Sequence, residues 1–296
     1  MTNPDYDREV DPEAPNESRA ISLRLVGSNK RVLEFGCATG RVTAALANRG
    51  CRVTALDIDA AAAERARPHA EDIVVVDLDE DDFEAKLAGQ RWEVALFGDV
   101  LEHLRDPLRV LRATRHLLDA QGTIVVSAPN VAHADVRLAL LGGEFPYSSS
   151  GLLDRTHLRF FTLRSLIQLL EDAGYLVVDV LRVVIPIFTS EIARRREEVP
   201  PAVVENVLAD PEAESYQYVV RAVVDSGDTT IRDLGERCLR LETALHDEKV
   251  RYAREVDRAR ARTNELEAEL RAIKSGRLMR CSALIRRVQR SISKST

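Results

Sequence analysis

The sequence predicts an α/β protein with a doubly wound, mostly parallel sheet, followed by a C-terminal coiled-coil helix. Short β-branched runs alternate with helical stretches between residues 30 and 225, as in parallel sheets whose strands are joined by helices. Apolar residues recur at three- and four-residue intervals between residues 231 and 273, as in coiled coils. The chain has 296 residues, 45% of them apolar and 30% charged, and this composition excludes a membrane-embedded or wholly disordered protein.

Seven segments are predicted as strands of a Rossmann-like sheet, because each is a short run rich in residues that favour strands. In chain order they are 30–36, 51–57, 72–77, 92–99, 122–129, 175–184 and 216–224. Segments 41–50, 106–122 and 162–174 have the periodicity of about 3.6 residues that predicts amphipathic helices, and each ends in glycine. We therefore expect a seven-stranded sheet with helices packed on it.

A loop-rich insert interrupts this alternation between residues 142 and 161. Four of the fourteen aromatic residues of the chain lie in it, namely Phe145, Tyr147, Phe160 and Phe161. Aromatic side chains carry large apolar surfaces that are mostly buried in folded proteins. We therefore expect the insert to pack as a lid or a pocket wall.

The chain is predicted to have four parts: an N-terminal segment and helix (1–29), an α/β domain (30–225), a coiled coil (226–274) and a basic tail (275–296). The coiled-coil seam runs from 231 to 273, with a four-residue step that indicates a stutter near His246. This seam predicts self-association or docking to a partner protein. A single long, solvated helix is the alternative, because Lys249 and Thr263 are weak seam residues.

The tail differs from the rest of the chain in charge. It has six basic residues and no acidic one, so it carries about +6 while the remainder carries about −12. Leucines and isoleucines alternate with the arginines, which favours contact with an anionic membrane surface; a disordered, solubilising terminus is the alternative. The acidic body lacks the basic face that nucleic-acid phosphates require, so we expect no nucleic-acid partner.

The cysteines indicate a reducing compartment. Cys37, Cys51, Cys238 and Cys281 are scattered without a CxxC pair, which disfavours a structural zinc site and a disulfide framework. The N-terminal segment has no apolar stretch typical of an export signal. We therefore expect a cytoplasmic protein, held at the inner face of the membrane if the tail binds lipid.

A glycine turn follows the first predicted strand, at Gly36 and Gly40, where an open α/β sheet binds nucleotide-like ligands. A dinucleotide fingerprint would need glycines at 36, 38 and 41, but the chain has Ala38 and Arg41 at the last two positions. The spacing therefore disfavours an NAD-dependent oxidoreductase.

Acidic residues lie at the ends of three successive strands, namely Glu34, Asp57 and Asp77. Asp57 is placed to accept hydrogen bonds from both hydroxyls of a ribose, and Asp77 could reach the amino group of an adenine. A single acid at a strand end is usually a helix cap or a solvated charge. Three of them beside one glycine turn favour a ligand that contains adenosine.

Segments 33–40, 55–59, 74–80, 97–107 and 122–130 together resemble the class I S-adenosylmethionine-dependent methyltransferases, in the branch similar to ubiquinone-biosynthesis O-methyltransferases. The resemblance covers about residues 15–225 and implies S-adenosylmethionine as cofactor. Ala38 departs from the glycine that many relatives have, but it is small enough to keep the turn. The resemblance implies that Gly36 and Gly40 let the backbone approach the methionine part of the cofactor and that Glu34 anchors this part. It also implies that Asp57, with the adjacent Ile58, binds the ribose and that Asp77 and the Leu78 amide bind the adenine. Asp99 would line the methionine end.

Two further segments suggest the methyl acceptor. Residues 129–162 are similar to a subgroup associated with bacterial glycan pathways, and residues 273–288 are similar to endings of polysaccharide-assembly enzymes. The resemblance implies an O-methyltransferase acting on a sugar or glycan hydroxyl in polysaccharide biosynthesis. The alternatives are methylation of a small secondary metabolite or quinone precursor, and a non-catalytic cofactor-binding scaffold that works through its coiled coil.

Methylation of a hydroxyl needs a general base, because a neutral alcohol is a poor nucleophile at pH 7. His103 follows the fourth strand and is the first candidate, and His157 in the insert is the second. The alternative for each is that it only orders a loop.

A divalent metal is a further possibility. Asp99, Glu102 and His103 form a D-x-x-E-H pattern similar to the E-x-x-E-H of some metal-dependent relatives, and His133 or His157 could complete the site. Such an ion would lower the pKa of a bound hydroxyl. Alternatively, Asp99 faces the cofactor and Glu102 starts a helix.

Overall fold

The computed structural model describes the backbone of residues 9–292 and the side chains of residues 9–275. The chain divides into two compact units, one ending at Thr243 and the other beginning at Ala244. The first unit contains the whole sheet, and the second, as far as Ile292, continues one helix. No helix in the described part of the chain is long and apolar enough to span a bilayer.

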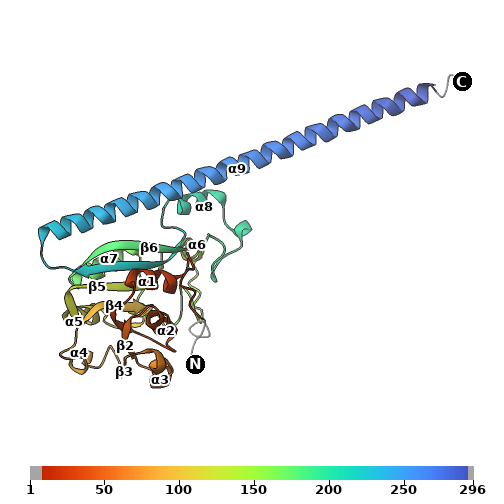
Figure 1. Cartoon of the computed structure of the whole chain (residues 1–296). Coiled ribbons are helices and arrows are strands. Elements are labelled where there is room, and N and C mark those ends of the chain that lie inside the picture. Colours follow the sequence, from red (N-terminus) through yellow and green to blue (C-terminus); the bar gives the residue numbers. More distant parts are fainter. Residues whose placement is uncertain (1–8, 293–296) are drawn as a thin grey trace. The chain divides into compact units, whose positions relative to one another are not determined.

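The sheet has seven strands in the order β3-β2-β1-β4-β5-β7-β6, which confirms the predicted fold class (Figure 1). Neighbours from β3 to β5 pair in parallel, and β7 is antiparallel to both β5 and β6. The strands in chain order are β1 (Arg31–Phe35), β2 (Arg52–Asp57), β3 (Asp72–Val75), β4 (Trp92–Gly98), β5 (Leu118–Pro129), β6 (Tyr175–Val184) and β7 (Ser215–Val224).

Helices cover both faces of this sheet. In one set, α2 contacts both α1 and α3 and the three helices pack on the sheet, and α4, α5 and α7 form a second connected set (Figure 1). Helices α6 and α8 lie together beside the later strands. Their bounds are α1 (Ser18–Val26), α2 (Arg41–Asn48), α3 (Ala60–Ala66), α4 (Phe83–Lys86), α5 (Pro107–Leu117), α6 (Ala134–Leu141), α7 (Leu163–Asp172), α8 (Pro201–Leu208) and α9 (Thr229–Ile292).

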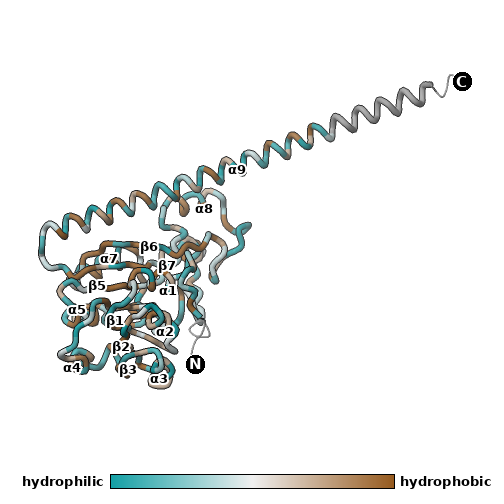
Figure 2. The backbone as a smooth tube through the Cα atoms, in the orientation of Figure 1, coloured by the Kyte–Doolittle hydropathy of each residue, from teal (hydrophilic) through white to brown (hydrophobic). Residues whose placement is uncertain are grey.

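Two hydrophobic cores form because side chains alternate between the faces of each strand. On β1, Val32 belongs to the core under α1 and α2, whereas Leu33 belongs to the core under α5 and α7. Figure 2 shows hydrophobic segments concentrated in the strands, as expected for a sheet buried on both faces. The two cores fix the sheet and therefore fix the loops at its carboxyl edge.

One helix is shorter than its sequence pattern predicts. The pattern predicts a helix over 106–122, but α5 ends at Leu117 and β5 begins at Leu118. Leu118 is buried and pairs with Trp92 of β4, and the backbone leaves the helical conformation there. Pairing within the sheet therefore overrides the helical periodicity of the last residues.

The insert packs against the domain, where Val136 and Ile192 contact it, and its role as a lid or pocket wall stays a prediction. Phe145 meets Tyr147 and Phe160 edge to face, and Leu152 and Leu153 are buried in a small cluster around the insert. Helix α6, which precedes the insert, and helix α8, which contacts α6, were not among the helices predicted from the sequence.

The free edge of β6 is covered by side chains. The Val180 amide donates to Glu242 of α9 at 2.9 Å, and Asn16 both accepts from the Val184 amide and donates to its carbonyl. These contacts occupy backbone groups that would otherwise be open to another strand. The start of α9 also packs on the domain, where Leu239 is half-buried against the core.

The turn after β1 is closely confined by its neighbours. Gly36 and Gly40 have φ values of 70° and 81°, in the left-handed region. A Cβ at Gly36 would lie 2.6 Å from Cγ2 of Val100, and a Cβ at Gly40 would lie 2.6 Å from the Cα of Ala66. Both glycines are therefore required by conformation and by space.

We predict that Gly40→Ala destabilises the protein by about 2 kcal/mol more than Gly89→Ala, because only the first methyl group meets backbone atoms. Gly89 is a matched control, since its φ is also 81° but nothing lies within 4 Å of its Cβ position. Urea unfolding followed by fluorescence of the single tryptophan, the buried Trp92, measures both variants. Equal losses of unfolding free energy in the two variants would show that the backbone of Ala66 moves aside for the added methyl group at little cost.

Candidate active site

A cavity lies at the carboxyl edge of the sheet, where β1, β4 and β5 end. It is lined by groups of both charges: Glu34 and Asp99 are acidic, and Arg19 and Arg41 are basic. The glycine turn forms one wall through Gly36 and the adjoining backbone. The cavity is therefore suited to a ligand that carries both positive and negative groups.

Glu34 is the most deeply buried acid of the glycine turn region. Its side chain accepts a hydrogen bond from the Thr43 hydroxyl at 2.7 Å. Burial raises the pKa of Glu34 to about 7, and the nearby charge of Asp57 acts in the same direction. A cation in the cavity would therefore be favoured, because it would stabilise the ionised form.

Asp57 orders the glycine turn from the end of β2. One carboxylate oxygen accepts from the Ala38 amide at 2.7 Å and the other from the Asp59 amide at 2.9 Å. Each oxygen keeps further capacity to accept a hydrogen bond. Ile58, which follows Asp57, is 66% exposed beside this edge.

Asp77 lies beyond the end of the neighbouring strand β3, at the same edge of the sheet. It accepts from the Asp79 amide at 2.9 Å, and its own amide donates to Asp81 at 3.1 Å. The carbonyl of Leu78 accepts from Arg109. The structure therefore places Asp57, Asp77 and Leu78 along one edge but not in the lining of the cavity, which contains Glu34, Gly36 and Asp99.

Asp99 is held in an unusual backbone conformation, with a φ of 57°. Its amide donates to the Ser127 hydroxyl at 3.0 Å, and its carboxylate accepts from that hydroxyl at 2.6 Å and from Gln217. Burial raises the pKa of Asp99, and the hydrogen bond from Ser127 and the charge of His103 oppose this effect. Asp99 therefore lies between the cavity and the histidine region.

His103 and His157 come together beside Asp99 although they are far apart in the sequence. Their ring centroids are 4.9 Å apart, with the rings edge to face. Nδ1 of His103 lies 3.2 Å from the Thr156 carbonyl oxygen, so Nδ1 carries the proton and Nε2 is left as the basic nitrogen. Burial lowers the pKa of His157, with a further contribution from His103, which favours a neutral ring.

Glu102 completes this cluster. Its side chain is buried, and Oε2 has no hydrogen-bond partner among the described residues. Burial raises the pKa of Glu102 well above its usual value, and the charge of Asp99 adds to the effect. One ligand atom from each of Glu102, His103 and His157 lies within 4.8 Å of the others, which is close enough to hold one metal ion.

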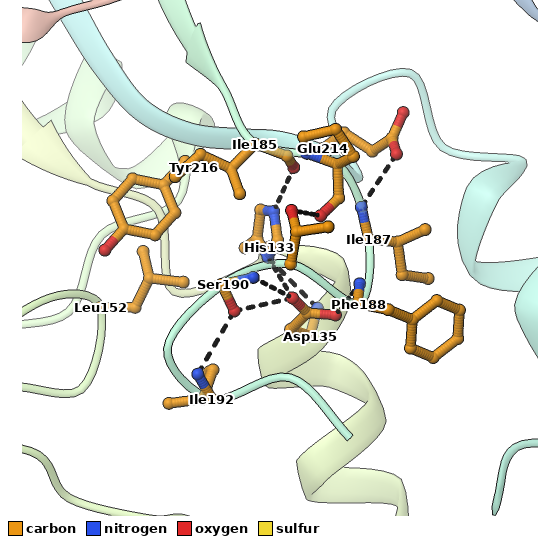
Figure 3. Close-up of polar contacts among 12 residues, drawn as sticks. His133, Asp135, Leu152, Ile185, Ile187, Phe188, Ser190, Ile192, Glu214 and Tyr216 are labelled. Atoms are coloured by element: carbon orange, nitrogen blue, oxygen red, sulfur yellow. Dashed lines mark hydrogen bonds and ion pairs between the residues drawn. The ribbon is translucent and has the colours of Figure 1, made fainter. Parts of the chain in front are cut away.

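His133, the other histidine considered for a metal site, has a structural role instead (Figure 3). Its Nε2 donates to the Ile185 carbonyl at 2.9 Å, and its Nδ1 accepts from the Asp135 amide at 3.2 Å. Asp135 in turn accepts from the Phe188 amide and the Ser190 hydroxyl. Nε2 thus ties the start of α6 to the loop after β6 and Nδ1 caps α6, so both ring nitrogens are already used, and His133 is not part of the Glu102, His103 and His157 cluster.

A larger hollow of about 660 Å³ lies over α4 and α5, with acidic residues such as Glu80 and Asp81 in its rim. These acids form ion pairs with Arg105 and Lys86. None of the site residues predicted from the sequence lines it. The site residues predicted from the sequence therefore lie outside this hollow.

Three residues of the site have no signal in the sequence. Arg19 and Ser22 reach the cavity from α1, which precedes every recognisable motif, and the Ser22 hydroxyl is buried without a partner among the described residues. Gln217 reaches Asp99 from β7, which lies 118 residues later in the chain. Only the packing of α1 and β7 beside β4 and β5 brings them to the site.

Comparison with known proteins gives a family match. Residues 6–180 match the family described as a methyltransferase domain. The chain is 34% identical over 128 residues to a ubiquinone biosynthesis O-methyltransferase of Xanthomonas campestris pv. campestris, and 36% identical over 128 residues to one of Xylella fastidiosa. The matches cover 42% of this chain and 54% and 52% of those proteins, so the chain spans about half the length of the curated relatives it matches.

Comparison with solved structures gives matches at lower identity. A SAM-dependent methyltransferase from Archaeoglobus fulgidus is 17% identical, with 70% of this chain and 94% of that chain covered and a TM-score of 0.49. A 1,6-didemethyltoxoflavin-N1-methyltransferase of Burkholderia thailandensis is 23% identical, with 72% and 79% covered and a TM-score of 0.46. Because the family match spans more than half of the sequence, the chain belongs to the methyltransferase-domain family.

Proposed function

We propose that this protein transfers a methyl group from S-adenosylmethionine to a hydroxyl oxygen. The observation that carries the proposal is the proximity of a charged cavity, with Glu34 and Asp99 in its lining, to the His103–His157 pair. Such an arrangement places a donor site next to a base.

The cavity is complementary to the methionine end of the donor. Glu34 and Asp99 would face the ammonium and sulfonium groups, and Arg19 would face the carboxylate. Asp57, at the end of β2, would accept hydrogen bonds from the ribose hydroxyls, and Asp77 would lie toward the adenine. These assignments follow the order of the strands along the edge.

The chemical step needs alignment and one proton acceptor. The acceptor hydroxyl gives its proton to Nε2 of His103, and its oxygen forms a bond to the methyl carbon. The carbon–sulfur bond breaks, and its electron pair stays on sulfur. The sulfonium thereby becomes the neutral thioether of S-adenosylhomocysteine. His157 packs against His103 and fixes the orientation of its ring.

A sugar hydroxyl is the acceptor class that we favour, for processing of a polysaccharide or related glycan. The insert presents Tyr147, which is 57% exposed, with Phe145 packed edge to face against it. Exposed aromatic rings of this kind suit the apolar face of a sugar ring. A quinone precursor or other small metabolite is the second candidate, and a panel of both classes in an assay for S-adenosylhomocysteine formation distinguishes them.

A divalent metal at Glu102, His103 and His157 is a second candidate for activating the acceptor. The unpartnered, buried Oε2 of Glu102 favours it, because a cation would offset the cost of that burial. A carboxylate with two imidazoles fits Zn²⁺ or Mn²⁺, and such an ion supplies Lewis acidity toward a bound hydroxyl. In this arrangement, His103 would be a ligand and not the base.

We predict that the protein binds S-adenosylhomocysteine and that Arg19→Gln weakens this binding by roughly tenfold, because the carboxylate loses a charged partner. Isothermal titration calorimetry measures both affinities. Arg24→Gln on the same helix is the control, since Arg24 contacts the carbonyls of Pro12 and Ala14. Absence of binding by the unmodified protein would refute the proposed function, and equal affinities would remove Arg19 from the site.

We predict that Glu34 lowers stability as pH rises, because ionisation of a buried carboxyl with a pKa of about 7 is unfavourable in the folded state. The protonated Glu34 side chain makes its full contribution to stability below its usual pKa of 4.5, and this contribution is lost as pH rises toward 7. Relative to Glu34→Gln, the unmodified protein should therefore lose about 2 kcal/mol of unfolding free energy between pH 5 and pH 8. Urea unfolding at several pH values tests this, and parallel curves for the two proteins would contradict it.

The metal candidate predicts that protein freed of metal with a chelator binds one Mn²⁺ per chain. Loss of a ligand in His157→Gln should weaken this binding by at least about tenfold. Electron paramagnetic resonance of free Mn²⁺ measures the bound fraction, and His116→Gln, on α5, is the control. If the unmodified protein binds no ion, the metal candidate is refuted.

A further inference from the structure

The second unit of the chain is a helix whose apolar residues form one stripe. From Ala244 to Ile292 it consists of α9, and between residues 249 and 273 the apolar residues of its sequence recur at three- and four-residue intervals. Tyr252 is 68% exposed, and Leu266, Leu270 and Ile273 are each about half exposed. We define the α9 stripe as the positions that follow this spacing: Lys249, Tyr252, Val256, Ala259, Thr263, Leu266, Leu270 and Ile273.

The beginning of α9 is anchored in a different way from the stripe. Gly235 is buried against Leu176, and Leu239 packs on the core of the first unit. Glu242 caps the edge of β6 through the Val180 amide. Contacts with the domain therefore hold α9 up to Thr243, whereas the stripe begins at Lys249 and, within the described residues, its side chains are exposed except for the half-buried Val256.

We infer that the α9 stripe pairs with the stripe of a second copy of this chain, in parallel and in register, as a two-stranded coiled coil. In heptad terms, Lys249, Val256, Thr263 and Leu270 occupy a positions, and Tyr252, Ala259, Leu266 and Ile273 occupy d positions. Burying these side chains against a partner removes apolar surface from water.

Charges beside the stripe identify the partner and its direction. In a parallel pair, each g residue faces the e residue five positions later in the other chain. All three such pairs within 249–274 have opposite charges: Glu255 with Arg260, Arg262 with Glu267, and Glu269 with Lys274. In a homodimer each pair occurs twice, so the two copies are complementary along the whole stripe.

The antiparallel alternative brings like charges together. In an antiparallel pair, g residues face g residues of the other copy. In the register that keeps the stripe fully paired, Glu255 would face Glu269 of the other copy, and Arg262 would face Arg262 of the other copy. Like charges at such flanking positions disfavour the arrangement. The pattern therefore selects the parallel pair.

The polar residues of the stripe favour two strands over a larger bundle. Lys249 and Thr263 lie at a positions, where a bundle of three or more helices would enclose them. In a two-stranded coil the Lys249 side chain can reach water along the side of the partner helix. These residues lower the stability of the pair but limit the number of strands.

Charge reversal in the full-length chain tests the pairing, with the dissociation constant measured by sedimentation equilibrium. Arg262→Glu and Glu267→Arg should each raise the dissociation constant of the dimer by about tenfold, because two attractive pairs become repulsive. The double variant, and an equimolar mixture of the two single variants, should restore it. Arg258→Glu is the control, because residue 258 lies at a c position away from the stripe.

The double variant also excludes an effect within one helix. Arg262 pairs with Glu265 and Arg271 with Glu267 in the same chain, so the double variant makes both contacts repulsive. Recovery of the dimer in spite of this must come from contacts between chains. Helix content measured by circular dichroism confirms that each variant keeps α9.

Four results would overturn the inference. A monomer at all concentrations would leave the stripe to a different protein, and a trimer or larger assembly would contradict the role of Lys249. Failure of the double variant to recover would contradict the parallel register. A loss in Arg258→Glu equal to that in Arg262→Glu would show that total charge, and not pairing, controls association.

Discussion

The close packing of the turn after β1 is the constraint on which the site depends. Gly36 and Gly40 hold left-handed conformations between Val100 and Ala66, and the Ala38 amide is fixed by Asp57 from the neighbouring strand. Because the turn cannot move away from these contacts, the backbone after β1 forms one wall of the cavity. The same contacts join β1, β2 and the loop after β4, so the sheet and the site are built together.

Buried carboxyl groups give the site its chemical character. Burial raises the pKa of Glu34, Asp99 and Glu102, and neighbouring acids add to the effect on Glu34 and Glu102. Keeping several acids together in a partly dry region is unfavourable unless a cation or a proton offsets their charge. The proposed donor supplies cationic groups beside Glu34 and Asp99, and a proton or a metal ion would serve Glu102. A bound cation would therefore stabilise the ionised forms of these buried acids.

Sequence reasoning predicted which residues meet at the sheet edge, and the structure places Glu34, Gly36 and Asp99 around one cavity there. The glycine turn, Glu34 and Asp99 were predictable because strand ends in a parallel sheet meet at one edge, whatever the details of packing. The pairing of His103 with His157 spans more than fifty residues and depends on how the insert folds back. Sequence could not choose between His133 and His157, since the choice rests on which ring nitrogens the backbone already uses. Arg19 and Gln217 carry no local pattern and were not predicted.

The sequence by itself determined the succession of strands and helices, the seven-stranded sheet and the heptad stripe of α9, because these follow from periodicity that each segment carries alone. The tertiary structure decided where α5 gives way to β5, which histidine joins His103, and which face of α9 the domain occupies before Thr243. Those outcomes depend on partners distant in the chain: Trp92 beside Leu118, the folded insert beside η3 (Leu101–His103), and the edge of β6 beside Glu242. Local patterns specify which elements can form, and competition for buried contacts and hydrogen bonds decides how they end and meet.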